Sequence, residues 1–241
     1  MNLKSTNFKI YLGGVYLAIL LTAMYFILSN FEISHFTSYD LIKENRGLIL
    51  KYKENNVFFL AVIFLITTIL LNVLMTPMFL PTLVTGFVFG KWLGTLILIF
   101  GNTIGGVLLY LLAKTFFSEL IKKKLAHRIS KFINFFKKNE LLYFMCFRLI
   151  GGGGTPFPMQ NVLPVIFNMS VKNYIVATFL GIIPTTFVTA SLGSGIEDII
   201  DQNAELSFTS AFLSPEIYLP IIGFAVILIT ALVIKKYFFK Q

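Results

Sequence analysis

Residues 141–161 read LLYFMCFRLIGGGGTPFPMQN and contain the feature that decides the fold. An apolar run leads to a single arginine, Arg148, and is then broken by four consecutive glycines and by prolines at 156 and 158. The apolar run suits a helix inside a membrane, but glycine and proline interrupt helices. Irregular backbone at membrane depth is tolerated only where it is buried in protein or lines a wet cavity. We therefore predict a helical hairpin that enters the membrane and turns back within it.

The composition of the chain is that of a membrane protein. Of its 241 residues, 56% are hydrophobic and only 13% are charged, whereas a soluble domain usually carries about a quarter charged residues. This excludes a soluble enzyme and a disordered chain, and the single cysteine, Cys146, excludes a disulfide scaffold. We expect an all-α, polytopic membrane protein with re-entrant hairpins. The net charge of +9 then indicates cytoplasmic loops and anionic lipid headgroups rather than nucleic acid.

Two segments have the length and composition of complete transmembrane spans. A helix needs about 20 mostly apolar residues to cross a bilayer. Residues 10–28 are uncharged and predict the first span, and residues 218–234, which are followed by lysines, predict the last. Two longer apolar regions, 57–117 and 141–196, lie between them, and neither contains an aspartate or a glutamate. The remaining membrane segments must come from these two regions.

The segments that separate the apolar regions differ in charge and predict which side each one faces. Residues 118–140 include seven basic residues against two acidic ones, whereas residues 197–215 include four acidic residues and no basic one. Lysine and arginine concentrate in cytoplasmic loops. We therefore predict that both termini and the 118–140 segment are cytoplasmic, and that 31–56 and 197–215 face outside.

This orientation requires each long apolar region to cross the membrane an odd number of times. Three spans, or one span plus a re-entrant hairpin, would satisfy it, and the helix breakers favour the hairpin. We predict a hairpin over about 57–90 and a span over about 92–116, then a second hairpin over about 141–168 and a span over about 171–195. The prolines expected to shape these hairpins and spans are Pro77, Pro81, Pro156, Pro158 and Pro184.

The two apolar regions repeat a pattern of helix breakers. Thr76-Pro77 recurs as Thr155-Pro156, and Gly101 follows the first proline by 24 residues as Gly181 follows the second by 25. With the predicted orientation, the two units are inverted relative to each other. Paired, interrupted and inverted segments are how many transporters build a site near the middle of the bilayer.

Short motifs in both regions occur in the order typical of one membrane-protein family. The first region supplies Gly86-Phe87-Val88-Phe89-Gly90, Gly101 with Gly105, and Tyr110 to Lys114; the second supplies Phe144 with Arg148, Pro156-Phe157 with Asn161, Ala177 to Pro184, and Ala190 to Gly195. In this ordered set the chain resembles the DedA/VTT-domain membrane proteins, also called SNARE-associated Golgi proteins, in their Tvp/TMEM-like branch. The resemblance covers residues 57–195 as a core. Residues 1–56 then hold the first span and an external amphipathic segment, and 196–241 hold the acidic external loop and the last span.

The resemblance implies both a fold and a function. It implies two re-entrant hairpins that face each other across the bilayer, and movement of phospholipids or polyprenyl-phosphate carriers between leaflets. Two departures from the family pattern matter. Gly151 stands where a proline usually follows the motif arginine by three residues, and no acidic residue lies between Glu54 and Glu119, where bacterial members have a membrane-embedded one. We therefore expect passive, energy-independent lipid movement, as by a scramblase or a flippase-like transporter.

Arg148 is the residue we expect to bind a lipid headgroup. A charge at membrane depth is costly and normally faces a wet cavity or a partner, and a guanidinium suits phosphate recognition. Headgroup binding is also expected of Asn161 and of the glycine run, which consists of Gly151, Gly152, Gly153 and Gly154. The alternatives are that Arg148 extends to the cytoplasmic headgroups, that the glycines form only a flexible tip, and that Asn161 makes an interhelical hydrogen bond.

The basic segment 118–140 has the pattern of an amphipathic helix that lies on the membrane surface. Its leucine, isoleucine and phenylalanine residues recur roughly at helical spacing among the lysines and arginines. We expect it to rest on an anionic leaflet, with a general anchoring role favoured over a dedicated lipid-gathering one.

The sequence offers no catalytic, metal or cofactor site. The two histidines, His35 and His127, lie in opposite loops without a cluster of cysteines or carboxylates, and Cys146 has no histidine or asparagine near it in the chain. We therefore expect a transporter without a cofactor, and not an enzyme.

Two other functions stay open on the sequence. Inverted hairpins would also suit a secondary transporter of a small solute coupled to H⁺ or Na⁺, and small-residue faces at Gly101/Gly105 and Gly193/Gly195 would suit a membrane assembly or structural factor. The expected partners are membrane lipids with anionic headgroups, without nucleic acid, and a homo-oligomer is compatible with the pattern. The lack of long tails favours a bacterial inner (plasma) membrane.

Overall fold

The structure is a computed structural model that describes the backbone of residues 39–201 continuously, with a few further residues between 11 and 22 and between 215 and 229. Within 39–201, side chains are described from residue 56 onwards, except over most of 117–135 and over 196–201. The predicted first and last spans and the acidic 197–215 loop therefore lie largely outside the described residues, as do the side chains of most of the 118–140 segment.

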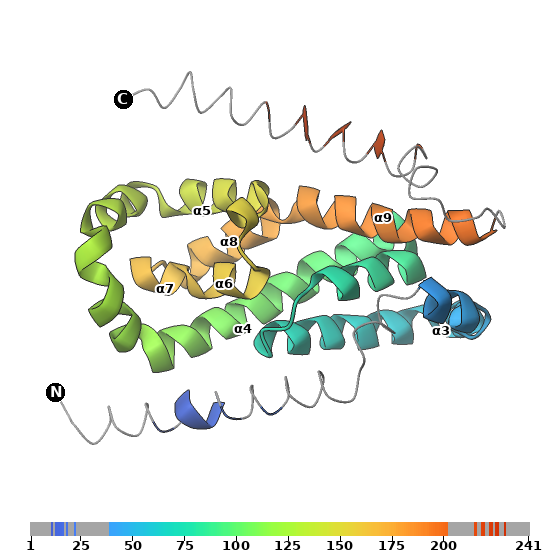
Figure 1. The fold of residues 1–241 in the computed structure, drawn as a ribbon, viewed down its shortest axis with the longest axis horizontal. Helices are drawn as coiled ribbons and strands as arrows, with labels where there is room; N and C mark the ends of the chain where they lie inside the picture. Colours follow the sequence, from blue (N-terminus) through green and yellow to red (C-terminus); the bar gives the residue numbers. More distant parts are fainter. Residues whose placement is uncertain are drawn as a thin grey trace.

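All the secondary structure between residues 39 and 201 is helical, which confirms the predicted all-α class (Figure 1). In chain order the elements are α3 (Tyr39–Val73), α4 (Phe79–Lys138), α5 (Glu140–Leu149), the 3₁₀-helix η1 (Gly151–Gly154), α6 (Phe157–Val162), α7 (Pro164–Phe167), α8 (Val171–Gly181) and α9 (Ile183–Asp201).

The first hairpin consists of the apolar part of α3 and the beginning of α4. Asn56 has non-helical dihedral angles (φ −148°, ψ 44°) and separates this apolar part from the more polar start of the helix. The chain turns between 74 and 78, where Met75 has a positive φ of 57°. Both the backbone N–H and the hydroxyl of Thr76 donate to the Leu71 carbonyl oxygen, at 3.0 and 2.9 Å. These bonds supply donors to a carbonyl group at the C-terminal end of α3. After the turn, the chain runs back alongside α3 (Figure 1).

A second reversal lies inside α4, at Gly90. This glycine has φ +73°, a conformation that cannot continue a right-handed helix. A Cβ atom placed on Gly94 would lie 3.1 Å from the carbonyl oxygen of Thr85, although nine residues of straight helix would span about 13 Å. The part of α4 after Gly90 therefore runs back along the hairpin and forms a long limb that crosses the molecule (Figure 1). It continues as helix to Lys138, so the predicted 118–140 segment follows from the span without an intervening loop.

The second hairpin consists of α5, η1, α6 and α7. Asn139 separates α4 from α5, and its side chain caps α5 by accepting from the backbone N–H of Leu142 at 3.4 Å. Pro156 precedes α6, and Pro158 lies in its first turn, where the missing N–H of proline costs nothing. The span after this hairpin is bent by 41° between α8 and α9, and Pro184 is the second residue after the bend.

The two hairpins enter the molecule from opposite ends, and their tips meet near its middle (Figure 1). Gly101 and Gly181, which follow Pro77 and Pro156 at similar distances in the sequence, have the same role in each half. A Cβ on Gly101 would lie 2.7 Å from the side chain of Thr68 on α3, and a Cβ on Gly181 would lie 2.5 Å from that of Arg148 on α5. In each half, therefore, the glycine lets the span pack closely against the first limb of its own hairpin.

The two halves contact each other through equally close approaches of backbone. A Cβ on Gly86 would lie 2.2 Å from the carbonyl oxygen of Ala190, and one on Gly193 would lie 2.1 Å from the carbonyl oxygen of Leu83. No side chain fits at these two positions. The glycines thus bring α9 into direct contact with the return limb of the first hairpin.

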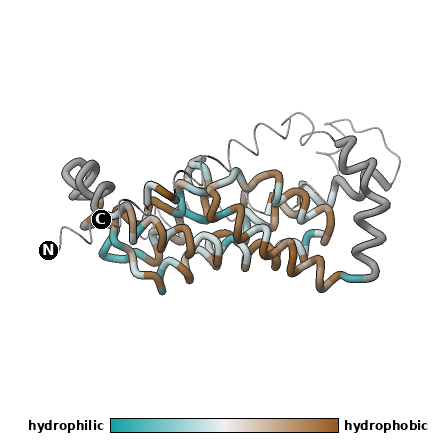
Figure 2. The backbone as a smooth tube through the Cα atoms, turned by 90° about the horizontal axis from the view of Figure 1, so that it is seen from below, coloured by the Kyte–Doolittle hydropathy of each residue, from teal (hydrophilic) through white to brown (hydrophobic). Residues whose placement is uncertain are grey.

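The outer surface of these helices is apolar, as expected for a protein that faces lipid. Phe58 and Trp92 are 82% and 71% exposed, and Figure 2 shows apolar residues along most of the described helices. By length and composition alone, the stretches Asn56–Val73 and Phe79–Phe116 are apolar enough to cross a membrane, and the bent pair α8 and α9 qualifies as a third. The second of these stretches includes the reversal at Gly90, so its crossing part is the limb that follows this glycine. The described part of the chain therefore has the architecture of a helical membrane protein.

Candidate functional site

Arg148 lies in the interior of the described structure, between the second hairpin and α8. It is only 1% exposed, although it is charged. Its guanidinium carbon lies 4.8 Å from the ring centres of both Phe144 and Phe157, and 5.8 Å from that of Tyr174. Aromatic faces attract a cation electrostatically. Arg148 is therefore enclosed by rings, and it does not extend to a surface.

Neutral oxygen atoms accept the hydrogen bonds of Arg148. Nη1 donates to Oε1 of Gln160 at 3.1 Å, and Nη2 donates to the hydroxyl of Tyr174 at 3.1 Å and to Oδ1 of Asn161. Nε is buried and has no partner among the described residues. Glu140 is the one acidic residue whose side chain is described, and it binds Ser170 and Asn173. The described structure therefore contains no carboxylate that neutralises Arg148.

A chain of buried amides extends from Arg148 into the first hairpin. Oδ1 of Asn161 also accepts from the Tyr174 hydroxyl at 2.9 Å, and Nδ2 of Asn161 lies 3.5 Å from Oδ1 of Asn72. Nδ2 of Asn72 in turn donates to Oδ1 of Asn102 at 2.9 Å. We call the residues Arg148, Asn161, Asn72 and Asn102 the polar chain. It connects the tips of both hairpins to the span after the first one.

Gly106 leaves the space that the polar chain occupies. A Cβ atom on Gly106 would lie 2.9 Å from the hydroxyl oxygen of Tyr174 and 3.1 Å from Oδ1 of Asn161. Both side chains are fully buried, so neither has free space to move into. The missing side chain on α4 therefore permits the hydrogen bond between Tyr174 and Asn161.

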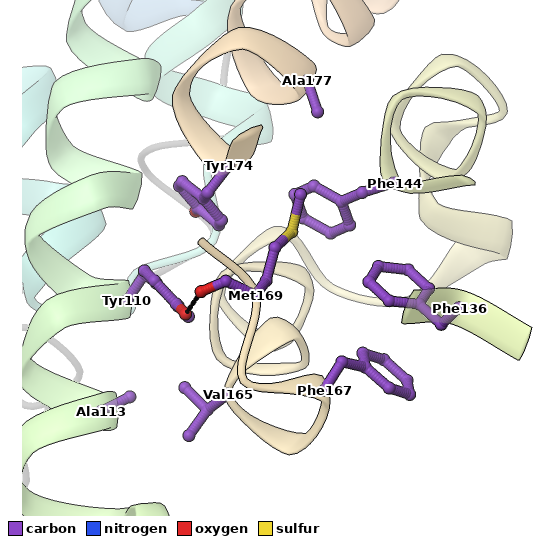
Figure 3. Packing of buried hydrophobic residues seen from close by; sticks show 9 residues of the cluster. All are labelled: Tyr110, Ala113, Phe136, Phe144, Val165, Phe167, Met169, Tyr174 and Ala177. Carbon is purple, nitrogen blue, oxygen red and sulfur yellow. Dashed lines mark hydrogen bonds between the residues drawn. The ribbon is translucent and has the colours of Figure 1, made fainter. Parts of the chain in front are cut away.

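Tyr174 is held in position by stacking as well as by hydrogen bonds. Its ring lies 4.7 Å from that of Tyr110, with an angle of only 9° between the ring planes. The hydroxyl of Tyr110 donates to the carbonyl oxygen of Met169, in the turn before α8 (Figure 3). Nζ of Lys114 donates to the same oxygen at 3.2 Å. The long limb of α4 thereby fixes the start of α8 and the position of Tyr174.

The glycine run forms the tip of the second hairpin and contacts Arg148 through Gln160. Gly151, Gly152 and Gly154 have φ values of +65°, +67° and +80°, which L-residues other than glycine rarely adopt. Nε2 of Gln160 donates to the carbonyl oxygens of Gly151, at 3.2 Å, and of Thr155, at 2.7 Å. The described contacts of this tip are thus made through its carbonyl groups, and a Cβ on Gly154 would meet nothing within 4 Å. The surroundings of Gly153 lie outside the described residues.

The predicted site residues differ in whether they contact Arg148 directly. Arg148 and Asn161 are in direct contact, whereas Gly151 and Gly152 meet Arg148 only through Gln160. Of the prolines, Pro77 lies in the first hairpin turn and Pro81 in the first turn of α4. In the second half, Pro156 directly precedes α6, and Pro158 and Pro184 are the second residues of α6 and α9.

Sequence reasoning missed four residues of this site: Asn72, Gly106, Gln160 and Tyr174. A signal existed for two of them, because Asn72 is an amide inside an apolar run, as Asn102 is, and Gln160 directly precedes Asn161. Tyr174 and Gly106 had no such signal, since tyrosines and glycines are frequent in this chain.

The VTT domain family matches residues 76–195, which is about half of the chain. The match begins at the tip of the first hairpin and ends in α9, so it includes most of the polar chain. The chain is a VTT-domain protein. The sequence resemblance to the DedA/VTT family is thereby confirmed, and the protein is an integral membrane protein.

A curated relative supports the same assignment. The VTT-domain protein is 24% identical over 193 residues to a protein of Caenorhabditis elegans named "Transmembrane protein 41 homolog". The alignment covers 77% of this chain and 74% of the relative, which agrees with the predicted TMEM-like branch. No solved structure shows significant similarity to the chain.

Proposed function

We propose that this VTT-domain protein moves phospholipids or polyprenyl-phosphate lipids between the leaflets of a membrane, as a scramblase or flippase-like transporter. The observation that carries the proposal is Arg148, a buried cation with only neutral acceptors in the described structure. A buried charge without a counter-ion is costly. An anionic headgroup would supply the missing negative charge at the point where the two hairpins meet.

The position of the polar chain suits the passage of a headgroup. The barrier to lipid movement is the apolar centre of the bilayer, where a polar headgroup has no hydrogen-bond partners. The hydroxyl of Tyr16, near the middle of the predicted first span, donates to the carbonyl oxygen of Val73 at the tip of the first hairpin. This contact supports a tip at mid-membrane depth. Amides there would replace water around a headgroup while the apolar outer surface contacts the lipid chains.

Family membership supports lipid movement, because the VTT/DedA family is linked to lipid scrambling. The sequence has no acidic residue between Glu54 and Glu119, so it offers no buried carboxylate there to couple transport to protons. The proposal is therefore passive movement down a gradient, by a transporter and not by an enzyme. The basic 118–140 segment supports cytoplasmic termini, and we propose a bacterial inner membrane as the location.

The experiment is a dithionite-quenching assay with fluorescent phospholipid in proteoliposomes. In vesicles that contain the wild-type protein, dithionite should quench more than the outer-leaflet fraction of the label. Arg148→Ala should reduce quenching to the level of empty vesicles, because it removes the charge that receives the headgroup. Lys172→Ala removes an exposed cation from α8 and should behave like wild type.

Two other results would redirect the proposal. Quenching that stays at the outer-leaflet fraction in wild-type vesicles would exclude general phospholipid scrambling, and the assay would be repeated with a fluorescent polyprenyl phosphate. Movement of a label that requires an imposed H⁺ or Na⁺ gradient would contradict passive transport and favour the ion-coupled alternative.

A further inference from the structure

The partners of Arg148 differ in how firmly they are held. Asn161 is 0% exposed, accepts from Tyr174, and lies within hydrogen-bond distance of Asn72. Tyr174 is stacked on Tyr110. Neither Asn161 nor Tyr174 can leave the guanidinium without breaking contacts to other helices. Both are therefore fixed parts of the site.

Gln160 is held differently, because its other hydrogen bonds go to the hairpin tip. It makes one bond to Arg148, and its Nε2 donates to carbonyl oxygens of Gly151 and Thr155. A Cβ on Gly151 or Gly154 would meet nothing within 4 Å, so the tip is not packed against other side chains at these positions. Gln160 is thus the one acceptor of Arg148 whose other hydrogen bonds go only to the tip, so its side chain can turn away from the guanidinium without breaking contacts between helices.

The guanidinium also has N–H groups that no described residue accepts. It has five N–H groups, but the described residues accept only the three hydrogen bonds to Gln160, Asn161 and Tyr174. Nε is fully buried and has no partner among the residues that the structure describes. A buried donor without an acceptor is rare and calls for an explanation such as an unfilled binding function. Arg148 therefore has capacity for a further acceptor, next to the one partner that is able to move.

We propose that Gln160 is an exchangeable ligand of Arg148. Its carboxamide oxygen accepts a hydrogen bond from the guanidinium when no lipid is bound, and an anionic oxygen of a lipid phosphate displaces it as the acceptor. This inference rests on the proposed function and assigns Gln160 as a positioning residue that sets how readily Arg148 accepts a headgroup. The exchange is favourable because hydrogen bonds between a cation and an anion are stronger than those to a neutral amide.

The chemistry of the side chain explains why an amide suits this role and a carboxylate does not. Glutamate at 160 would form a permanent buried ion pair with Arg148, which a lipid phosphate could not displace without leaving an uncompensated charge. It would also lose the Nε2 donor that binds Gly151 and Thr155. Glutamine keeps the guanidinium hydrogen-bonded and positioned, and it leaves the positive charge available.

The test measures binding of a lipid phosphate separately from transport. The full-length protein is purified in a neutral detergent, and its apparent melting temperature is followed against the concentration of dihexanoyl phosphatidylglycerol, with dihexanoyl glycerol as the blank. A ligand that binds the folded state raises this temperature. The variants are Gln160→Met, which keeps a similar volume without the amide, Gln160→Glu, and the control Met159→Glu, which adds a carboxylate at a neighbouring residue that is 61% exposed.

We expect Gln160→Met to bind the phosphatidylglycerol about three- to tenfold more tightly, because one competing hydrogen bond is removed. Gln160→Glu should bind at least about tenfold more weakly, and Met159→Glu should bind like wild type. Weaker binding by Gln160→Met, or unchanged binding by Gln160→Glu, would overturn the exchange. Should Gln160→Met not fold, Gln160→Ala takes its place with the same expectation.

Two further arms separate this inference from the proposed function. In one outcome, the variants bind phosphatidylglycerol as expected but the wild-type protein does not scramble lipid in vesicles. This outcome would support the exchange at Gln160 and contradict the proposed function. Scrambling by the wild-type protein with identical binding in all variants would do the reverse. A second measurement replaces the lipid with inorganic phosphate. If inorganic phosphate raises the apparent melting temperature and the phosphatidylglycerol does not, an anion exchanges with Gln160 but a lipid headgroup is not its occupant.

Discussion

At the scale of single residues, the centre of this protein depends on a glycine as much as on its arginine. Gly106 has no functional group, yet the Tyr174 hydroxyl and the Asn161 amide occupy the space that its side chain would fill. These two groups accept hydrogen bonds from Arg148. Displacing them would leave more of the guanidinium unpaired in a buried site, which is a severe penalty.

We predict that Gly106→Ala lowers both stability and lipid movement. The added methyl group overpacks a buried site, at a cost of about 1–3 kcal/mol, and it separates Tyr174 from Asn161. The melting temperature of the purified protein and the initial rate of dithionite quenching should both fall. Gly14→Ala is the matched control, since a Cβ there would meet nothing within 4 Å. Equal behaviour of the two variants would show that Gly106 does not shape the site.

At the scale of one element, the 3₁₀-helix η1 combines an unusual backbone with a contact to Gln160. Gly152 and Gly154 both have positive φ values, so any side chain at either position strains the backbone. They differ in their surroundings. A Cβ on Gly152 would lie 2.1 Å from Cδ of Gln160, whereas one on Gly154 would meet nothing within 4 Å. The pair therefore separates backbone strain from displacement of Gln160.

Comparing Gly152→Ala with Gly154→Ala should resolve these two effects. Each substitution should destabilise the protein through the left-handed conformation, by about 1–2 kcal/mol. Only Gly152→Ala should also push Gln160 away from Arg148 and change the affinity for dihexanoyl phosphatidylglycerol. Thermal unfolding measures the shared effect, and lipid titration measures the specific one. Identical titrations for both variants would argue against a link between the tip and Arg148.

At the scale of the whole molecule, the two halves are arranged in opposite directions. The first hairpin, formed by α3 and the beginning of α4, enters from one end of the described structure, and the second, which begins with α5, enters from the other end (Figure 1). The tips meet between these ends, where Asn161 lies close to Asn72. In a membrane, this arrangement puts the residues after Gly90 and those before Asn139 on opposite sides.

Cysteine labelling tests that orientation. In a Cys146→Ser background, Lys91→Cys and Lys138→Cys should react with a membrane-impermeant maleimide from opposite sides of sealed vesicles. We expect Lys138→Cys to label from the cytoplasmic side, because it lies in the basic 118–140 segment. The unsubstituted background should not label. Reaction of both cysteines from the same side would contradict the inverted arrangement.

Several features of this fold and site follow from local composition. Glycine and proline interrupt a helix whatever surrounds them, so the hairpin tips near Pro77 and Pro156 could be predicted from the chain alone. Arg148 was identifiable for a similar reason, since a charge between an apolar run and a broken loop has few roles in a membrane. The predicted boundaries of the headgroup site and the roles of its glycines stay predictions.

The partners of Arg148 could not be read in this way, because they come from distant parts of the chain. Tyr174 is 26 residues from Arg148, and Asn72 is 89 residues from Asn161. Residue type says that a buried amide needs a partner, but the choice of partner depends on which helix faces lie together after folding. Backbone breaks are properties of individual residues, whereas the polar chain exists only because glycines such as Gly106 and Gly181 let the helices that carry it pack closely.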